Sequence, residues 1–172
     1  MHERELTVVR VDTDLGPGWG ECSALPDPTY TNEFAAGAFR QLATELGPAI
    51  VGRTLGAEDP WFELRAVCPE PDRHPMAMAA LEMAVIDARL RAAGRSLAAH
   101  LAGPDGPPTT VAAGAAIGLG SIADIAASAA RLADEGFGRL KLKVEPGHDL
   151  AAVAAVCEAA PDVELHVDGN GS

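Results

Sequence analysis

The sequence has no long hydrophobic run and few cationic residues, and both absences exclude classes of protein. No apolar stretch approaches the roughly 18 residues that a membrane-spanning helix needs, and no basic segment followed by an apolar one opens the chain. With 13 basic against 25 acidic residues, the net charge of −12 disfavours nucleic acid and anionic membranes as partners. We therefore expect a soluble, acidic protein of the cytoplasm.

Cysteine is also scarce, and several familiar motifs are missing. Cys22, Cys68 and Cys157 are an odd number, lie far apart and form no CxxC pair, which predicts reduced thiols rather than a disulfide frame or a zinc site. No GxGxxG follows a predicted strand, and neither a P-loop nor a Ser/His/Asp set is present. The 172 residues give room for one domain, or for a small domain and part of another.

Lysine is the rarest charged residue, and its placement is the most informative feature of the composition. Eleven of the 13 basic residues are arginine, and the only lysines are Lys141 and Lys143. In a chain so rich in alanine, glycine and arginine, a retained lysine indicates a position where arginine cannot replace it. Asparagine is equally rare, with only Asn32 and Asn170.

The first part of the chain has the pattern of an antiparallel α+β unit. We expect strands at 5–13 and 19–24, a loop at 25–32, and helices at 33–46, 57–67 and 76–93. Thr31 or Asn32 is the expected cap of the first helix, which should end at Gly47-Pro48, and Gly94 should end the last. Spacings of four, three and four give that last helix an apolar face, which we expect to be buried: Ala79, Met83, Ile86 and Leu90.

After residues 103–109 the pattern changes to alternating strands and helices. We expect strands at 110–117, 139–144 and 163–168, and helices at 122–135 and 150–159, the first of them capped by Ser121. This order predicts parallel βαβ units with right-handed crossovers. The expected units are residues 1–105 and 106–172.

The two lysines alternate with apolar residues in the run RLKLKV at 139–144. In a strand, this period of two places both ammonium groups on one face and Leu140 and Leu142 on the other. The apolar face of a helix-covered parallel strand packs on the helices, so the lysines should point away from them. Two neighbouring ammonium groups repel, which favours the neutral amine that acts as a general base. A solvated lysine pair on an edge strand explains the spacing equally well.

A carboxylate ends the next predicted strand. The period of two in VELHVD at 163–168 places Glu164, His166 and Asp168 on one face, with Asp168 at the carboxyl end, where parallel α/β folds carry working residues. A carboxylate there suits Mg²⁺. Asp168-Gly169-Asn170 is also a turn sequence, which composition alone favours. The functional interpretation therefore depends on two lysines ending one strand and a carboxylate ending the next.

These motifs together resemble a known family. Lys141-x-Lys143 followed by Asp168-x-Asn170 is similar to the second and third barrel strands of the enolase superfamily, muconate-lactonising subgroup. The helix AALEMAVID at 79–87 is similar to the helix that leads into the barrel there. Three further segments resemble the branch of o-succinylbenzoate synthases and N-succinylamino-acid racemases: GWGEC at 18–22, PTYTNE at 28–33 and KLKVEPGHD at 141–149.

The resemblance implies a fold and a chemistry. The implied fold class is α/β: an α+β capping domain over residues 1–105, followed by the first three strands of a (β/α)₈ barrel over 106–172. Mg²⁺ (or Mn²⁺) would be held by carboxylates that end strands three, four and five of the full barrel, and a base would remove a proton α to the carboxylate of a small-molecule substrate. The roles carried over are the acid/base lysine, its neighbour, the first metal ligand, the polar residue beside it, and two loop residues that select substrate: Lys143, Lys141, Asp168, Asn170, Leu25 and Tyr30.

Two enzymes of this branch remain open. In an o-succinylbenzoate synthase, a lyase of menaquinone synthesis, the same lysine would help hydroxide leave. In an N-succinylamino-acid racemase, a lysine on strand six would act on the opposite face. Another muconate-cycloisomerase-like activity and a homo-oligomeric full-length enzyme are further alternatives.

The length departs from the family. Residues 110–172 supply a few strands, whereas a (β/α)₈ barrel takes ~200 residues or more. The family's first capping strand, the later metal ligands and the strand-six lysine have no counterpart in the sequence. We therefore expect an incomplete chain, inactive alone, and the competing hypothesis of another class is a non-catalytic product that needs a complementary chain.

Overall fold

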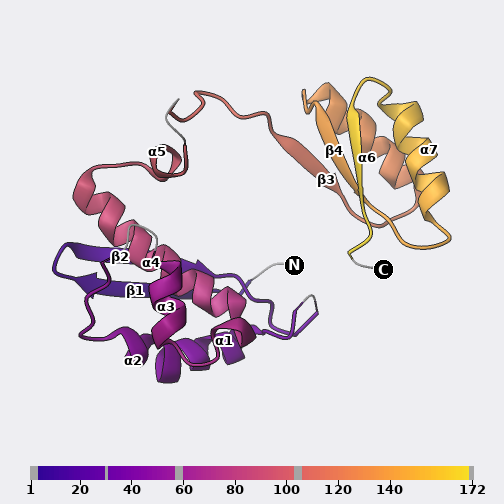
Figure 1. The fold of residues 1–172 in the computed structure, drawn as a ribbon. Helices are drawn as coiled ribbons and strands as arrows, with labels where there is room; N and C mark the ends of the chain where they lie inside the picture. The colour runs from indigo at the N-terminus through magenta and orange to yellow at the C-terminus, as the bar shows by residue number, and fades with distance from the viewer. Residues whose placement is uncertain (1–3, 30, 57–59, 103–105, 171–172) are drawn as a thin grey trace. The chain divides into compact units, whose positions relative to one another are not determined.

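Two hydrophobic cores divide the chain into two units, Met1–Pro107 and Pro108–Ser172. The structure is a computed structural model that describes residues 4–29, 31–56, 60–102 and 106–170. In Figure 1 the first unit runs from indigo to pink and the second from orange to yellow.

A β-hairpin opens the first unit, as predicted. Strand β1 (Thr7–Thr13) pairs antiparallel with β2 (Gly16–Cys22), and Thr13 lies opposite Gly16. The second strand therefore begins at Gly16 rather than at Trp19. Two residues, Asp14 and Leu15, make the turn, and Gly16 takes a φ of +117°, a conformation that glycine adopts without a Cβ penalty.

The predicted helix over 33–46 is longer and more irregular than expected. It comprises α1 (Ala35–Gln41), a π-helical segment η1 (Leu42–Leu46) and α2 (Gly47–Ile50). The expected stop at Gly47-Pro48 is wrong, because the helical backbone continues from η1 into α2 and Pro48 lies in the first turn of α2. The expected side-chain cap is also wrong: Phe34 is the N-cap residue, and Thr31 instead accepts a hydrogen bond from the Glu33 N–H at 3.1 Å.

Four further helices complete the described part of the first unit: α3 (Trp61–Val67), the 3₁₀ turn η2 (Pro71–Arg73), α4 (Pro75–Ala93) and α5 (Leu97–Leu101). The part of the predicted 57–67 helix at 57–59 lies outside the described residues. The predicted α4 is confirmed, and Gly94 ends it with a φ of +60°.

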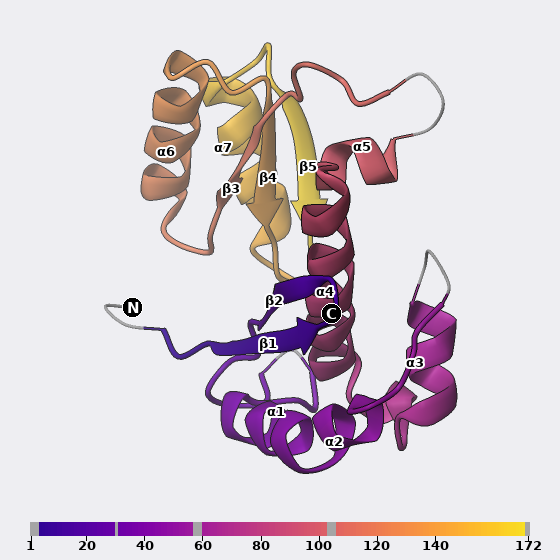
Figure 2. The ribbon, with the colours of Figure 1, turned by 90° about the vertical axis from the view of Figure 1, so that its left-hand side faces the viewer.

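The buried face of α4 differs from the predicted one. Met83 is 44% exposed, whereas small side chains dominate the buried positions: Ala77, Met78, Ala80, Leu81, Ala84, Val85 and Ala88. The reason is the close approach of β2, visible in Figure 2. A Cβ on Gly20 would lie 1.9 Å from the Ala80 carbonyl oxygen, and one on Gly18 would lie 2.0 Å from that of Ala84. The helix backbone thus packs directly on two strand glycines, and only alanines fit beside them.

The second unit has the predicted βαβαβ order. It contains β3 (Gly114–Ile117), α6 (Ile122–Asp134), β4 (Arg139–Lys143), α7 (Asp149–Ala159) and β5 (Glu164–Asp168). The strands form a parallel sheet in the order β3-β4-β5. Ser121 caps α6 as expected, and its Oγ accepts from the Asp124 N–H at 3.2 Å. The first strand begins at Gly114 rather than at Thr110, after an irregular stretch.

The alternation along β4 is as the sequence predicts. Leu140 and Leu142 are fully buried in a core shared with α6 and α7. Lys141 is exposed and Lys143 is partly buried, so both lysines lie on the face away from these helices. Within the second unit, side chains of α6 and α7 share a core with Leu140 and Leu142, so both helices pack on the apolar face of the sheet.

Candidate active site

The candidate site lies at the carboxyl ends of β4 and β5. In the parallel register Lys143 is opposite Asp168, and Lys141 is opposite His166. Because parallel strands end at the same edge, this register brings the two sequence motifs together, although 25 residues separate Lys143 from Asp168. The site is therefore a product of the βαβ topology.

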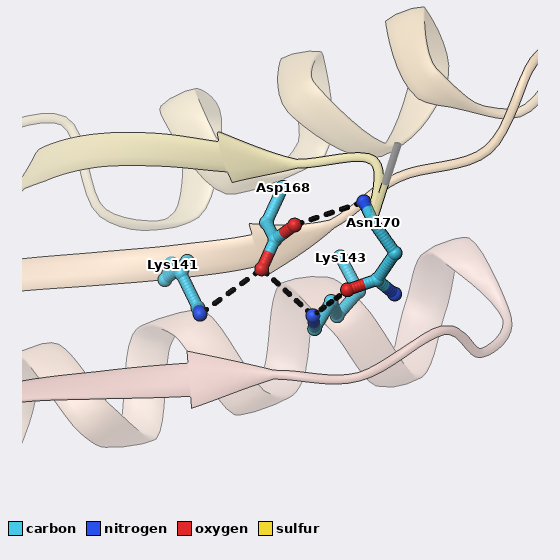
Figure 3. A network of polar contacts seen from close by, with 4 residues as sticks. All are labelled: Lys141, Lys143, Asp168 and Asn170. Atoms are coloured by element: carbon cyan, nitrogen blue, oxygen red, sulfur yellow. Dashed lines mark hydrogen bonds and ion pairs between the residues drawn. The ribbon is translucent and has the colours of Figure 1, made fainter. Parts of the chain in front are cut away.

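One carboxylate oxygen binds both lysines. Asp168 Oδ2 lies 2.7 Å from Lys143 Nζ and 3.0 Å from Lys141 Nζ, as Figure 3 shows. The Lys141 side chain is 50% exposed and that of Lys143 is 25% exposed. Lys143 is thus the more enclosed amine, held beside a carboxylate, and differs from the freely solvated lysine of the alternative interpretation.

Asn170 contacts both Asp168 and Lys143. Its backbone N–H donates to Asp168 Oδ1 at 2.9 Å, and its side-chain carbonyl accepts a hydrogen bond from Lys143 Nζ. The residue has a φ of +51°, in the left-handed region, which asparagine tolerates better than most residues. This backbone conformation turns the amide back toward the lysine.

The electrostatics of the cluster favour the ionised carboxylate. Hydrogen bonds from Lys143, from the Asn170 backbone and from Lys141 hold the pKa of Asp168 well below its usual range. The sequence predicted repulsion between the two ammonium groups. The Asp168 carboxylate, which contacts both of them, offsets this repulsion. The cluster of two lysines and one aspartate has a net positive formal charge, whereas the chain as a whole is acidic.

Comparison with known proteins identifies the family. Residues 1–103 match the family described as mandelate racemase / muconate lactonizing enzyme, N-terminal domain. The chain belongs to this family. It is 41% identical over 170 residues to an N-succinylamino acid racemase of Amycolatopsis sp, covering 97% of this chain and 44% of that protein. It is 32% identical over 173 residues to an o-succinylbenzoate synthase of Bacillus subtilis (strain 168), covering 100% and 45%.

Solved structures of enolase superfamily members share the fold. A member from Listeria innocua Clip11262 superimposes with a TM-score of 0.84 at 28% identity, over 98% of this chain and 44% of that one. A mandelate racemase/muconate lactonizing enzyme from Roseovarius nubinhibens, complexed with magnesium, gives a TM-score of 0.78 at 28% identity, over 96% and 46%. The predicted fold class and family resemblance are therefore confirmed, and the chain spans less than half the length of the curated relatives it matches.

Of the other two residues assigned from the family resemblance, Leu25 and Tyr30, only Leu25 lies among the described residues. Leu25 belongs to the first unit, where its carbonyl oxygen accepts from the Ala35 N–H at 2.8 Å and closes the loop that precedes α1. Tyr30 lies outside the described residues. His166 and Glu164 both lie on β5, and His166 Nε2 is 2.7 Å from Glu164 Oε1. This contact lowers the pKa of Glu164. The roles of Leu25 and Tyr30 stay predictions.

The structure also shows a polar residue that the sequence argument missed. Glu33, only 6% exposed, accepts hydrogen bonds from the backbone N–H groups of Met76 at 2.6 Å and Ala77 at 3.1 Å. It thereby caps the first turn of α4 from 43 residues away. The sequence held no local sign of this contact, because an N-capping motif is recognised only when cap and helix are adjacent. In this family member, Glu33 ties the loop before α1 to the long helix.

A complete metal site cannot be built from the described residues of this family member. No group of three or more histidine, cysteine, aspartate or glutamate side chains gathers anywhere among them. Asp168 offers one carboxylate, and protein N–H groups bind both of its oxygens. Hard oxygen ligands of this kind suit Mg²⁺, but a single carboxylate does not hold the ion tightly.

None of the described helices is long and apolar enough to cross a membrane.

Proposed function

We propose that this chain forms part of an o-succinylbenzoate synthase-like lyase, in which Lys143 removes the proton α to a substrate carboxylate. The observation that carries the proposal is the pairing of Lys143 with Asp168 at the ends of adjacent parallel strands, 2.7 Å apart. The likeness to o-succinylbenzoate synthase and N-succinylamino acid racemase along nearly the whole chain supports it.

Each of the three charged residues has its own role in the proposed reaction. Lys143, in its neutral form, takes the α proton while the electron pair of the C–H bond moves toward the carboxylate. The resulting ammonium then gives a proton to the departing hydroxide, the C–O bond breaks, and water leaves. Lys141 contributes a second positive charge where negative charge develops, and Asp168 orients both amines.

Mg²⁺ (or Mn²⁺) is the proposed cofactor, with Asp168 as its one ligand from the described residues. A bound divalent cation would stabilise negative charge on the substrate carboxylate. Its remaining ligands would come from the part of the relatives that this chain does not match, since it covers 44% of the racemase.

N-succinylamino acid racemase activity is the second candidate. The racemase of Amycolatopsis sp is 41% identical to this chain, whereas the synthase of Bacillus subtilis is 32% identical. Both activities begin with the same removal of an α proton, so Lys143 would have the same role in either.

The test uses a chimera of this chain with the remaining part of the Amycolatopsis racemase. Proton exchange at the α carbon of an N-succinylamino acid is followed by NMR in D₂O. We expect Lys143→Ala to lower the exchange rate by about 10²- to 10⁴-fold, because general acid–base catalysis contributes that much.

Lys143→Arg is the matched control. Arginine keeps a cation beside Asp168 but stays protonated and cannot accept the α proton. We expect Lys143→Arg to lose exchange as Lys143→Ala does, in a folded protein by circular dichroism. Recovery of exchange by arginine would show that the lysine is needed only for its charge, and wild-type exchange in both variants would refute the role.

A further inference from the structure

We propose that Asn170 is a positioning residue, which fixes the direction of the Lys143 ammonium group. The inference rests on the proposed function of Lys143 but concerns a separate property, the orientation of the amine. Its basis is the geometry in Figure 3, in which one residue binds both members of the Lys143–Asp168 pair.

An ammonium group at the end of a four-carbon stem has three equivalent hydrogens and rotates freely unless acceptors hold it. Here the Lys143 ammonium group donates two of its three hydrogens to Asp168 Oδ2 and Asn170 Oδ1. Among the described residues no acceptor is recorded for the third. With two hydrogens fixed, the third can point in one direction only, and that hydrogen is the one available for transfer to substrate.

Asp168 alone would not fix this direction. Its Oδ2 is shared with Lys141, so it constrains each amine through one hydrogen bond and leaves rotation about that bond. Asn170 supplies the second point of attachment for Lys143. Lys141, by comparison, contacts Asp168 alone among the residues that the structure describes, and its side chain is 50% exposed.

The backbone of Asn170 explains why this residue type occupies the position. The left-handed φ of +51° brings the amide oxygen to Lys143 while the N–H of the same residue donates to Asp168 Oδ1. Glycine adopts this φ but has no acceptor, and aspartate both tolerates the φ and keeps an oxygen at the same place. These two replacements therefore separate the backbone conformation from the side-chain acceptor.

The first experiment exploits the scarcity of lysine. In the 172-residue chain labelled with ¹⁵N-lysine, only two ammonium signals exist, and Lys141→Arg assigns them. We expect the Lys143 ammonium to have the higher NMR order parameter in the unsubstituted chain. Asn170→Gly should lower it to about that of Lys141, whereas Asn170→Asp should preserve it. An unchanged Lys143 signal in Asn170→Gly, or equal order of the two amines in the unsubstituted chain, would overturn the inference.

The second experiment measures the consequence for catalysis in the racemase chimera. Because a misplacement of about 1 Å can cost on the order of a hundredfold in rate, we expect Asn170→Gly to lower kcat for α-proton exchange tenfold or more, with KM changed little. Asn170→Asp keeps the acceptor but adds a carboxylate that favours the ammonium form, so its kcat profile should shift to higher pH while its plateau kcat stays within a few-fold of the unsubstituted chimera. Wild-type kcat in Asn170→Gly, or equal loss in both variants, would contradict the positioning role while loss of exchange in Lys143→Ala still upheld the proposed function.

Discussion

At the scale of single residues, burial separates groups that the sequence presents as alike. The three cysteines are free, but Cys22 and Cys68 are buried in the first unit and Cys157 is exposed on α7. Burial raises the pKa of the Cys22 and Cys68 thiols, so fewer of them are ionised at a given pH. Since the thiolate is the reactive form, burial makes Cys22 and Cys68 less reactive, whereas Cys157 is accessible to a reagent.

We therefore expect one thiol of the native chain to react rapidly with a disulfide reagent such as DTNB at pH 8. The other two should react only when the protein is unfolded in denaturant, because the reagent must reach them and they must ionise. The release of thionitrobenzoate over time measures both phases. Cys157→Ser should remove the fast phase, and a fast phase of two thiols would contradict the burial of Cys22 or Cys68.

At the scale of elements, the first unit is organised by the contact of α4 with the hairpin. The glycines of β2 leave room for the backbone of α4, and alanines of α4 pack beside them. Met78 and Leu81 of the same helix are also buried, whereas Met83 is 44% exposed. Close packing of this kind transmits any added volume directly to the backbone.

Replacement of Gly20 by alanine should therefore destabilise the first unit. The new Cβ would lie 1.9 Å from the Ala80 carbonyl oxygen, so α4 must shift, at a cost of about 1–3 kcal/mol or more. Urea denaturation followed by circular dichroism measures the loss. Gly56→Ala is the matched control, since its Cβ would meet only the Glu63 carboxylate at 3.7 Å. Equal stability of the two variants would show that the close contact is absent in solution.

Glu33 is the second link between elements. Both of its carboxylate oxygens accept backbone N–H groups of α4, and glutamine can offer only one acceptor there. We expect Glu33→Gln to lower the free energy of unfolding by about 1–3 kcal/mol, because a buried N–H is left facing an amide donor. Glu5→Gln, at an exposed position, should change it little. A Glu33→Gln variant as stable as the unsubstituted chain in urea would contradict the cap.

At the scale of the whole molecule, the described residues form two units, and the candidate catalytic cluster lies in the second alone. The cluster has a base candidate and one carboxylate but no assembled metal site among those residues. The chain spans 44% of the length of the racemase it resembles, and the catalytic roles of the cluster stay proposals. Whether the protein forms homo-oligomers stays a prediction.

The 172-residue chain by itself should show no Mg²⁺-dependent turnover. One carboxylate already bound by two ammonium groups cannot hold the cation tightly, so charge on the substrate would not be stabilised. Formation of o-succinylbenzoate is followed by absorbance at saturating Mg²⁺, with the Bacillus subtilis synthase as the positive control. Measurable product from this chain alone would refute the expectation.

The order of strands and helices in the second unit was predictable, although its first strand begins at Gly114 rather than at Thr110. Its strand β4 alternates leucine with lysine, and Ser121 lies directly before α6, so the information was local. The candidate site followed from the same alternation, because the ends of adjacent parallel strands meet at one edge. In the first unit, the continuation of the helix through Pro48 and the buried face of α4 were not predictable, because each depends on a partner distant in sequence or on a local irregularity.

The sequence by itself determined the order of the strands and of the longer helices, which side of β4 is apolar, and that Lys141, Lys143 and Asp168 end neighbouring strands. Periodicity and capping are properties of neighbouring residues, so no further information was needed for them. Only the tertiary structure decided that one carboxylate oxygen is shared by both amines, that Asn170 turns back onto Lys143, and that Glu33 caps a helix far along the chain. Such contacts depend on atomic distances between separate elements, and these are set by packing rather than by spacing along the chain.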